Sequence, residues 1–361
     1  KNRVVCVLRS RELDDFIMCC FATKAIPKVN CRAPVNQFSS CQDLMKNKAL
    51  QVCIWILGLL ALFGNLFVII LRSIVKEDNT VHSFFLANLA AADFLMGIYM
   101  LIIAFKDAQW QGEYFKHDMV WRSSGLCQFA GAVSMLSSEV SVLTLTLITA
   151  DRFICIVFPF RMRRLGRRKA CFYIASIWVI GAVISLVPTL GFDYFNDKRS
   201  NSNYYGRSAV CLPVELSKEK LAGWEYSVAI FIVLNFASFM FILCAYIAMF
   251  FKVRQVTKGV RSTQMNRESS MAKRMIFIIL TDFFCWMPVI VIGILSLLGK
   301  FHDPKKQAYA WIAVFVLPIN SSINPILYTF STPSVSKHVS TRTGKLRKAL
   351  KRAKPESGIG E

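Results

Sequence analysis

Residues 321–331 read SSINPILYTFS and close an otherwise apolar run that begins at Ala310. Proline removes a backbone hydrogen bond and kinks a helix, and a buried asparagine amide needs hydrogen-bond partners. Asn324 and Pro325 therefore carry two costs that leucine or alanine would avoid. The rest of the sequence must supply partners for the amide and a use for the bend.

The composition predicts an all-α membrane protein. The chain has 361 residues, 55% of them hydrophobic, and a mean hydropathy of +0.44, which is too apolar for a soluble domain of this size. A bilayer core about 30 Å thick needs roughly 20 apolar residues per helix. Seven runs of this kind are present, which predicts a bundle of seven transmembrane helices: 49–71, 82–105, 126–157, 169–190, 224–251, 271–298 and 307–330.

The distribution of basic residues predicts the orientation, because loops rich in Lys and Arg stay cytoplasmic. Such loops follow the first, third and fifth runs, and the tail after the seventh run is also basic. We therefore expect an extracellular N-terminus, a cytoplasmic tail at 332–361 and a short amphipathic helix within that tail. The net charge of +22 lies in loops that flank apolar helices, so it favours anionic membrane lipid over nucleic acid as the partner.

The cysteines divide between the two sides of this topology. Five precede the first helix, Cys127 opens the third and Cys211 lies in the long outer loop, where disulfides persist. Cys127 with Cys211 is the favoured pair, since this bond would tie the outer tip of the third helix to the loop that covers the bundle.

Polar residues recur inside the apolar runs, where they are expensive and mark functional or interior positions. One or more occurs in the first, second, third, sixth and seventh helices, which predicts a shared internal network. Its members are Asn65, Asp93, Ser141, Asp282, Asn320 and Asn324.

These residues lie in ordered motifs: GN at 64–65, LANLAAAD at 86–93, DRF at 151–153, CWMP at 285–288 and NPILY at 324–328. In this order, and on these helices, they resemble the rhodopsin-like G-protein-coupled receptors. A lone Trp178 in the fourth run extends the match. The resemblance covers about residues 53–336 and implies heterotrimeric G proteins as partners at the plasma membrane.

A narrower resemblance comes from less common details. The fifth run has Ser238 where the class usually places proline, and the sixth has Asp282 where a bulky aromatic is commoner. With SSEVSVL and LPINSSINPILYT, these resemble the leucine-rich-repeat hormone receptors, particularly relaxin receptors and their invertebrate relatives. The resemblance implies that residues 1–48 are a hinge at the end of a repeat ectodomain that captures a peptide or protein hormone. The seven-helix domain would then be 49–331.

The resemblance also implies an activation switch at the cytoplasmic ends of the helices. Arg152 would pair with Asp151 and with Glu268 at the start of the sixth helix in the inactive packing. Snorkelling at the membrane edge is the alternative for Arg152. Tyr246 and Tyr328 would meet Arg152 in the open form, and Phe160, among the arginines of the second inner loop, would contact the G protein.

Two interpretations of Asp93 stay open, because an isolated buried carboxylate needs a proton, a cation or several donors. The resemblance implies a sodium ion at Asp93, Ser141, Asn320 and Asn324, an all-oxygen set that suits a hard cation. The alternative is a protonated Asp93 in a hydrogen-bond network. No cofactor is required in either case.

The sixth and seventh helices carry the parts expected to move. Asp282 is expected to join Asn320 or Asn324 and lock the two helices together. Pro288 beside Trp286, and Pro325, are interpreted as hinges, and static kinks are the alternative.

Other classes fit less well. The sequence has no HExxH, GxSxG, P-loop or metal-spaced histidine cluster, so we do not expect an enzyme. A transporter or channel would also place a carboxylate in the membrane, but the two halves of the chain show no internal repeat. A non-signalling scaffold would have no need of an intact DRF and NPILY. The uncharged stretch after Cys127 argues against a small amine ligand.

Overall fold

The computed structural model describes residues 16–25, 40–75, 79–158, 165–196, 203–212, 222–256, 263–300, 311, 315 and 317–331. Within these ranges the side chains of 22, 23, 25, 256, 263–275, 277, 278, 317 and 328–331 are not described. The predicted tail helix after residue 332 and the beginning of the predicted hinge lie outside the described residues.

The described part of the chain is helical and contains no strand. Among the residues that the structure describes, six helical segments are long and apolar enough to cross a membrane, which agrees with the first six predicted runs. For the seventh run, α12 is described over Leu317–Ser331. The long helices are α3 (Lys48–Ile74), α4 (Thr80–Gln109), α6 (Gly125–Val157), α7 (Arg167–Leu186), α9 (Asn235–Val256) and α10 (Thr263–Leu297). The short elements are α2 (Phe16–Ala25), η1 (Tyr114–Lys116), α5 (Asp118–Ser123), η2 (Val187–Thr189), η3 (Tyr205–Arg207) and α8 (Trp224–Ser227).

Side-chain caps fix where three of the long helices begin. Asn47, Asn79 and Ser124 each accept a hydrogen bond from a backbone N–H in the first turn of α3, α4 and α6. These donors would otherwise be unsatisfied at a helix end. The observed starts therefore lie within two residues of the predicted ones.

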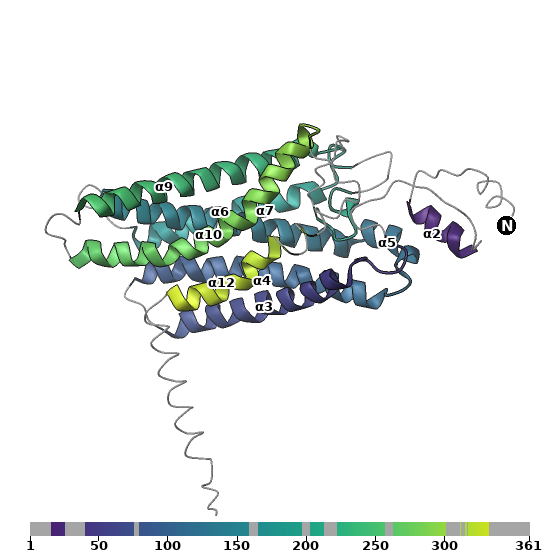
Figure 1. Cartoon of the computed structure of the whole chain (residues 1–361), viewed down its shortest axis with the longest axis horizontal. Helices are drawn as coiled ribbons and strands as arrows, with labels where there is room; N and C mark the ends of the chain where they lie inside the picture. Colours follow the sequence, from purple (N-terminus) through teal and green to yellow (C-terminus); the bar gives the residue numbers. More distant parts are fainter. Residues whose placement is uncertain are drawn as a thin grey trace, which may run out of the picture.

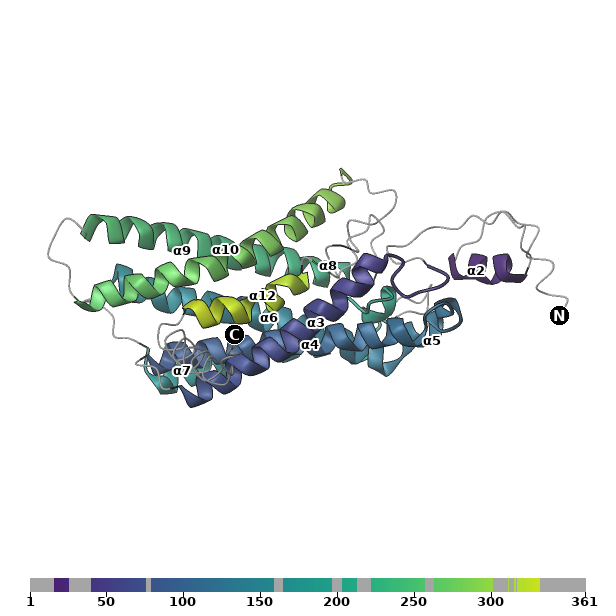
Figure 2. The same ribbon diagram turned by 60° about the horizontal axis from the view of Figure 1, so that its bottom comes forward.

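The helices run side by side along the long axis of the molecule (Figure 1). The elements α2 and α5 lie at one end, and the end of α9 and the beginning of α10 lie at the other (Figures 1 and 2). This arrangement agrees with the predicted alternation of outer and inner loops. Phe63, Phe172 and Phe284 are 61%, 69% and 68% exposed, as expected for side chains that face lipid.

Glycines allow α3 to approach its neighbours closely. A Cβ atom on Gly97 of α4 would lie 2.6 Å from the backbone nitrogen of Leu62, and one on Gly64 of α3 would lie 2.8 Å from Pro325 Cγ. Small residues at such crossings let membrane helices pack backbone to backbone. The tight packing of α3, α4 and α12 positions the polar residues described below.

The fifth transmembrane segment is not a uniform α-helix. Between α8 and α9 the chain forms a π-helix, η4 (Val228–Leu234), in which the hydrogen-bonded turn holds one extra residue. The sequence indicated only that the usual proline is missing. In the sixth segment, α10 bends along its length and contains Pro288 (Figures 1 and 2).

Candidate functional site: a polar network inside the helix bundle

Asp93 of α4 is fully buried and is the centre of the network. Its Oδ1 accepts hydrogen bonds from Ser141 Oγ of α6 at 3.3 Å and from Ser321 Oγ of α12 at 3.0 Å. Its Oδ2 accepts from Asn324 Nδ2 at 2.8 Å. One carboxyl group therefore joins three transmembrane helices, as expected for a buried acid that must be satisfied by several donors.

Asn320 contacts the acid of the sixth helix. Its Nδ2 donates to Oδ1 of Asp282 on α10, which is one of the two contacts expected for that acid. Ser321, the next residue, donates to Asp93. The sequence analysis missed Ser321, although a hydroxyl in SSINP was a visible signal. A step of one residue turns a helix by about 100°, which is why these two neighbours face different carboxyl groups.

Asn65 and Ser322 attach α12 to α3. Asn65 Nδ2 donates to the backbone oxygens of Ala61 at 2.8 Å and Ser321 at 2.9 Å, and Ser322 Oγ lies 2.9 Å from the backbone oxygen of Leu57. These bonds hold the segment that contains Pro325 against the rigid first helix. The partners that the opening motif required are thus present.

The network is rich in oxygen atoms that accept hydrogen bonds. Within the described part of the chain, the Oδ1 atoms of Asn65, Asn320 and Asn324 are buried and have no hydrogen-bond partner. Carboxyl and amide oxygens are suitable ligands for a hard cation, so Asp93, Ser141 and Asn324 fit the sodium expectation. Asn320 donates its Nδ2 to Asp282, and its Oδ1 has no partner among the described residues. The donors on Asp93 fit the hydrogen-bond alternative too.

Trp286 lies in the core beside the network. It is 4% exposed, and its ring lies 6.1 Å from that of Phe239 on α9. Pro288 follows two residues later inside α10, and Pro325 lies inside α12. Pro288 follows Asp282 by six positions and Pro325 follows Asn320 by five, so each helix has a proline within two turns of this contact.

At the end of α6 that the sequence predicts to be cytoplasmic, Arg152 and Asp151 form an ion pair. Arg152 is 2% exposed, so it is packed inside the bundle end rather than extended along its surface. Tyr246 of α9 packs nearby with Ile156 and Met249. Its hydroxyl is buried without a hydrogen-bond partner among the described residues. Such a hydroxyl is available for a contact made in another arrangement of the helices.

Three predicted switch residues remain untested by the geometry. The backbone of Glu268 lies in α10 and that of Tyr328 in α12, but their side chains are not described. Phe160 lies outside the described residues. The bond from Arg152 to Glu268 therefore stays a prediction.

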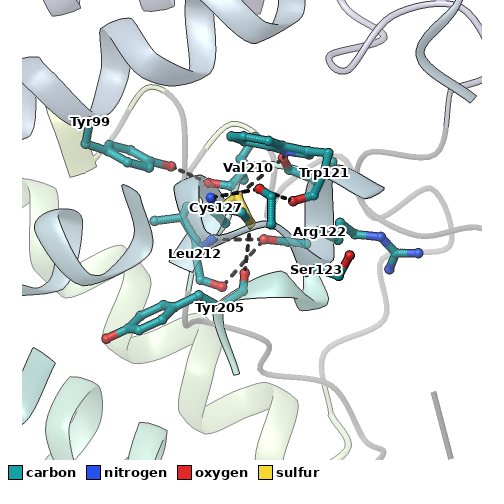
Figure 3. Close-up of a disulfide and its surroundings, with 12 residues drawn as sticks. Tyr99, Trp121, Arg122, Ser123, Cys127, Tyr205, Val210 and Leu212 are labelled. Carbon is teal, nitrogen blue, oxygen red and sulfur yellow. Dashed lines mark hydrogen bonds between the residues drawn. A yellow bond between two sulfur atoms is a disulfide. The ribbon is translucent and has the colours of Figure 1, made fainter. Parts of the chain in front are cut away.

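The outer end of the bundle is covered by residues 203–212, which we call the lid. The predicted disulfide between Cys127 and Cys211 attaches the lid to α6 (Figure 3). Tyr99 Oη donates to Val210 O at 2.8 Å, and Trp121 Nε1 donates to Ala209 O at 2.7 Å. The lid is therefore tied to α4, α5 and α6 at once. The analysis of the sequence found the disulfide but not these aromatic donors.

Two lid tyrosines reach further into the bundle. Tyr205 Oη donates to Ser185 O of α7 at 2.6 Å, and Tyr204 Oη lies 2.7 Å from Ser227 Oγ of α8. Burial raises the pKa of both hydroxyls, so both remain protonated and able to donate. In the sequence, the adjacent tyrosines of NYYG at 203–206 were the sign of these two contacts.

The segment before α3 is attached to the outer end of α4 and to η1. Met45 N donates to Asp107 Oδ1 at 2.9 Å, and Tyr114 N donates to Gln42 O at 3.0 Å. A disulfide between Cys20 and Cys41 joins α2 to this segment. Phe21 of α2 packs edge-on against Phe115 of η1, with ring centroids 4.9 Å apart. A continuous series of contacts thus connects α2 to the tips of the transmembrane helices.

A bundle of apolar helices with this ordered network defines a class of membrane receptor. The profile of the family described as "7 transmembrane receptor (rhodopsin family)" matches residues 64–328. The chain belongs to this family, whose members are receptors and not enzymes.

Within this family, the chain is similar to several individual receptors. The chain is 47% identical over 337 residues to the G-protein coupled receptor GRL101 of Lymnaea stagnalis, covering 93% of this chain and 29% of the relative. It is 37% identical over 306 residues to human relaxin receptor 1, covering 84% and 39%. It is 30% identical over 312 residues to the pig thyrotropin receptor, covering 86% and 38%. The chain thus spans less than half the length of these relatives.

Proposed function

We propose that this chain is the membrane-spanning part of a hormone receptor. In this proposal an extracellular leucine-rich-repeat domain captures a peptide or protein hormone, and the bundle transmits the event to heterotrimeric G proteins at the plasma membrane. The relatives support the proposal, because relaxin and thyrotropin receptors are named for hormones. Their greater length leaves room for a large ligand-binding region outside the matched part.

The observation that carries the proposal is the contact between Asp282 of α10 and Asn320 of α12. This bond crosses between two proline-containing helices and is buried, so it stabilises one arrangement of the two. A purely structural bundle would not need a buried acid at this position. The contacts of residues 40–47 and α2 with the outer tips supply the extracellular input.

The deciding experiment measures ligand-independent nucleotide exchange on a panel of purified G proteins by membranes that carry this chain. Arg152→Ala is expected to abolish exchange, because the guanidinium at the cytoplasmic end would contact the G protein. Glu268→Ala is expected to raise exchange, because it would remove the partner that holds Arg152. Normal surface expression of each variant is the control.

Silence of all three proteins with every G protein would contradict signalling by the bundle alone and favour a scaffold. A second assay then uses a chain extended by the part of the Lymnaea relative that lies outside the matched region. Ion flux in vesicles without nucleotide exchange would instead favour the transporter class.

A further inference from the structure

The fifth transmembrane segment makes two sets of polar contacts, one at its outer end and one deeper in the bundle. Its π-helix is what allows both sets to form at the same time. At the outer end, Ser227 Oγ lies 2.7 Å from Tyr204 Oη of the lid, and Tyr226 Oη donates to Ile184 O of α7 at 2.6 Å. Deeper in the bundle, Asn235 Nδ2 donates to Glu139 Oε1 of α6 at 3.3 Å. Between the two sets lies η4, over Val228–Leu234.

The helical geometry shows why the extra residue matters. Asn235 follows Ser227 by eight positions. In an uninterrupted α-helix at 100° per residue, the two side chains would point about 80° apart. A π turn holds one more residue, which removes about 100° and brings them to within about 20°. By the same count, Tyr226 moves from the face opposite Asn235 to about 80° from it.

The burial pattern agrees with this geometry. Phe231 and Ile232 are adjacent in sequence and are 3% and 9% exposed, so the wide turn presents two neighbours to the bundle. The N–H of Asn235 donates to Ile230 O, the five-residue spacing of a π turn. In an α-helical register Val228 would take the place of Ser227 beside the lid, and valine cannot bond to Tyr204.

The deeper contact is weakly held. Glu139 and Asn235 are both fully buried, yet one bond of 3.3 Å joins them. Glu139 Oε2 and Asn235 Oδ1 lack partners within the ranges that the structure describes. Buried polar groups left unsatisfied cost free energy, so this contact adds little to the stability of the π form. π turns are rare and occur mostly as single turns inside α-helices, so a plain α-helix is the alternative register for this segment.

We propose that η4 is a clamp for the lid: in the π form Ser227 holds Tyr204, and in the α form the outer end of the segment turns by about 100° and releases it. Because the lid is bonded to α4 and α6, the clamped form keeps the outer ends of the helices together. Clamping therefore favours the resting receptor and release favours activation. The signalling half of this inference rests on the proposed function.

Deletion of Val233 tests the clamp, because this side chain is 61% exposed and faces lipid. After the deletion Asn235 follows Ser227 by seven positions instead of eight. The two side chains then point to within about 20° of each other in a plain α-helix. The deletion thus keeps both sets of contacts and removes the alternative register. We expect normal surface expression and lower ligand-independent nucleotide exchange than in the parent chain.

Deletion of Phe241, 42% exposed in α9, is the matched control. It shortens a regular α-helix, turns the outer part of the segment by about 100° and is expected to abolish surface expression. Ser227→Ala, which loses the lid bond without changing register, is expected to raise exchange about fivefold, the factor set by one typical hydrogen bond.

Three results overturn the inference. If both deletions fail to reach the surface, the register argument is wrong. If the Val233 deletion is expressed and exchanges nucleotide like the parent, η4 is a spacer and not a clamp. If Ser227→Ala leaves exchange unchanged, the lid bond does not restrain the receptor. Absence of exchange by the parent chain itself would contradict signalling by the bundle alone, and the two deletions would still test the register by expression.

Discussion

Replacing Asp282 by alanine is expected to raise ligand-independent signalling. Asp282 is 3% exposed and accepts a hydrogen bond from Asn320, which joins α10 to α12. Removing this acceptor leaves the buried amide of Asn320 without its partner, which costs about 1–3 kcal/mol. A loss of about 2 kcal/mol multiplies the equilibrium constant for separating the two helices by about 30.

The size of the effect follows from the population of the active arrangement. If that arrangement is populated at about 1%, a thirtyfold change raises it to roughly one fifth. Nucleotide exchange on purified G protein should then rise by about twentyfold at equal surface expression. Asp282→Asn keeps the size and one acceptor oxygen, so it should give a smaller rise, about threefold to tenfold.

The reasoning is refuted if Asp282→Ala exchanges nucleotide at the rate of the parent chain while both are expressed equally. Asn320→Ala removes the other half of the contact and should reproduce the effect. In the double variant the two increases should not multiply, because both remove one bond. Multiplying increases would show that Asp282 acts through a different partner.

Three further results are expected. If the site at Asp93 takes sodium, raising sodium against potassium should lower ligand-independent exchange, and Asp93→Asn should remove this dependence; equal responses would favour the hydrogen-bond network alone. Cys211→Ser opens a disulfide whose ends are 84 positions apart, a loop size that contributes about 4–5 kcal/mol, so the thermal unfolding midpoint in detergent should fall, and an unchanged midpoint would argue against the bond to Cys127. Gly97→Ala places a Cβ 2.6 Å from a backbone nitrogen of α3 and should reduce surface expression, whereas Gly125→Ala, with nothing within 4 Å, should not; equal expression of the two would contradict the close crossing.

Much of the fold could be predicted because its signals are local. The length of each apolar run, the caps at Asn47 and Asn79 and the prolines at 288 and 325 act on the chain within a few residues. The class could be predicted as well, because the motifs from GN at 64–65 to NPILY at 324–328 occur in the order seen in rhodopsin-like receptors. The disulfide from Cys127 to Cys211 followed from the topology and is present.

The sequence by itself therefore determined which stretches of the chain form the long apolar helices and most residues of the polar network. Only the tertiary structure decided which partners meet. Asn320 bonds to Asp282 while Ser321 bonds to Asp93, and the π turn aligns Ser227 with Asn235. A single residue turns a helix by about 100°, so these choices depend on how the neighbouring helices are rotated and packed. That rotation is set by contacts between residues far apart in the chain, which no local pattern records.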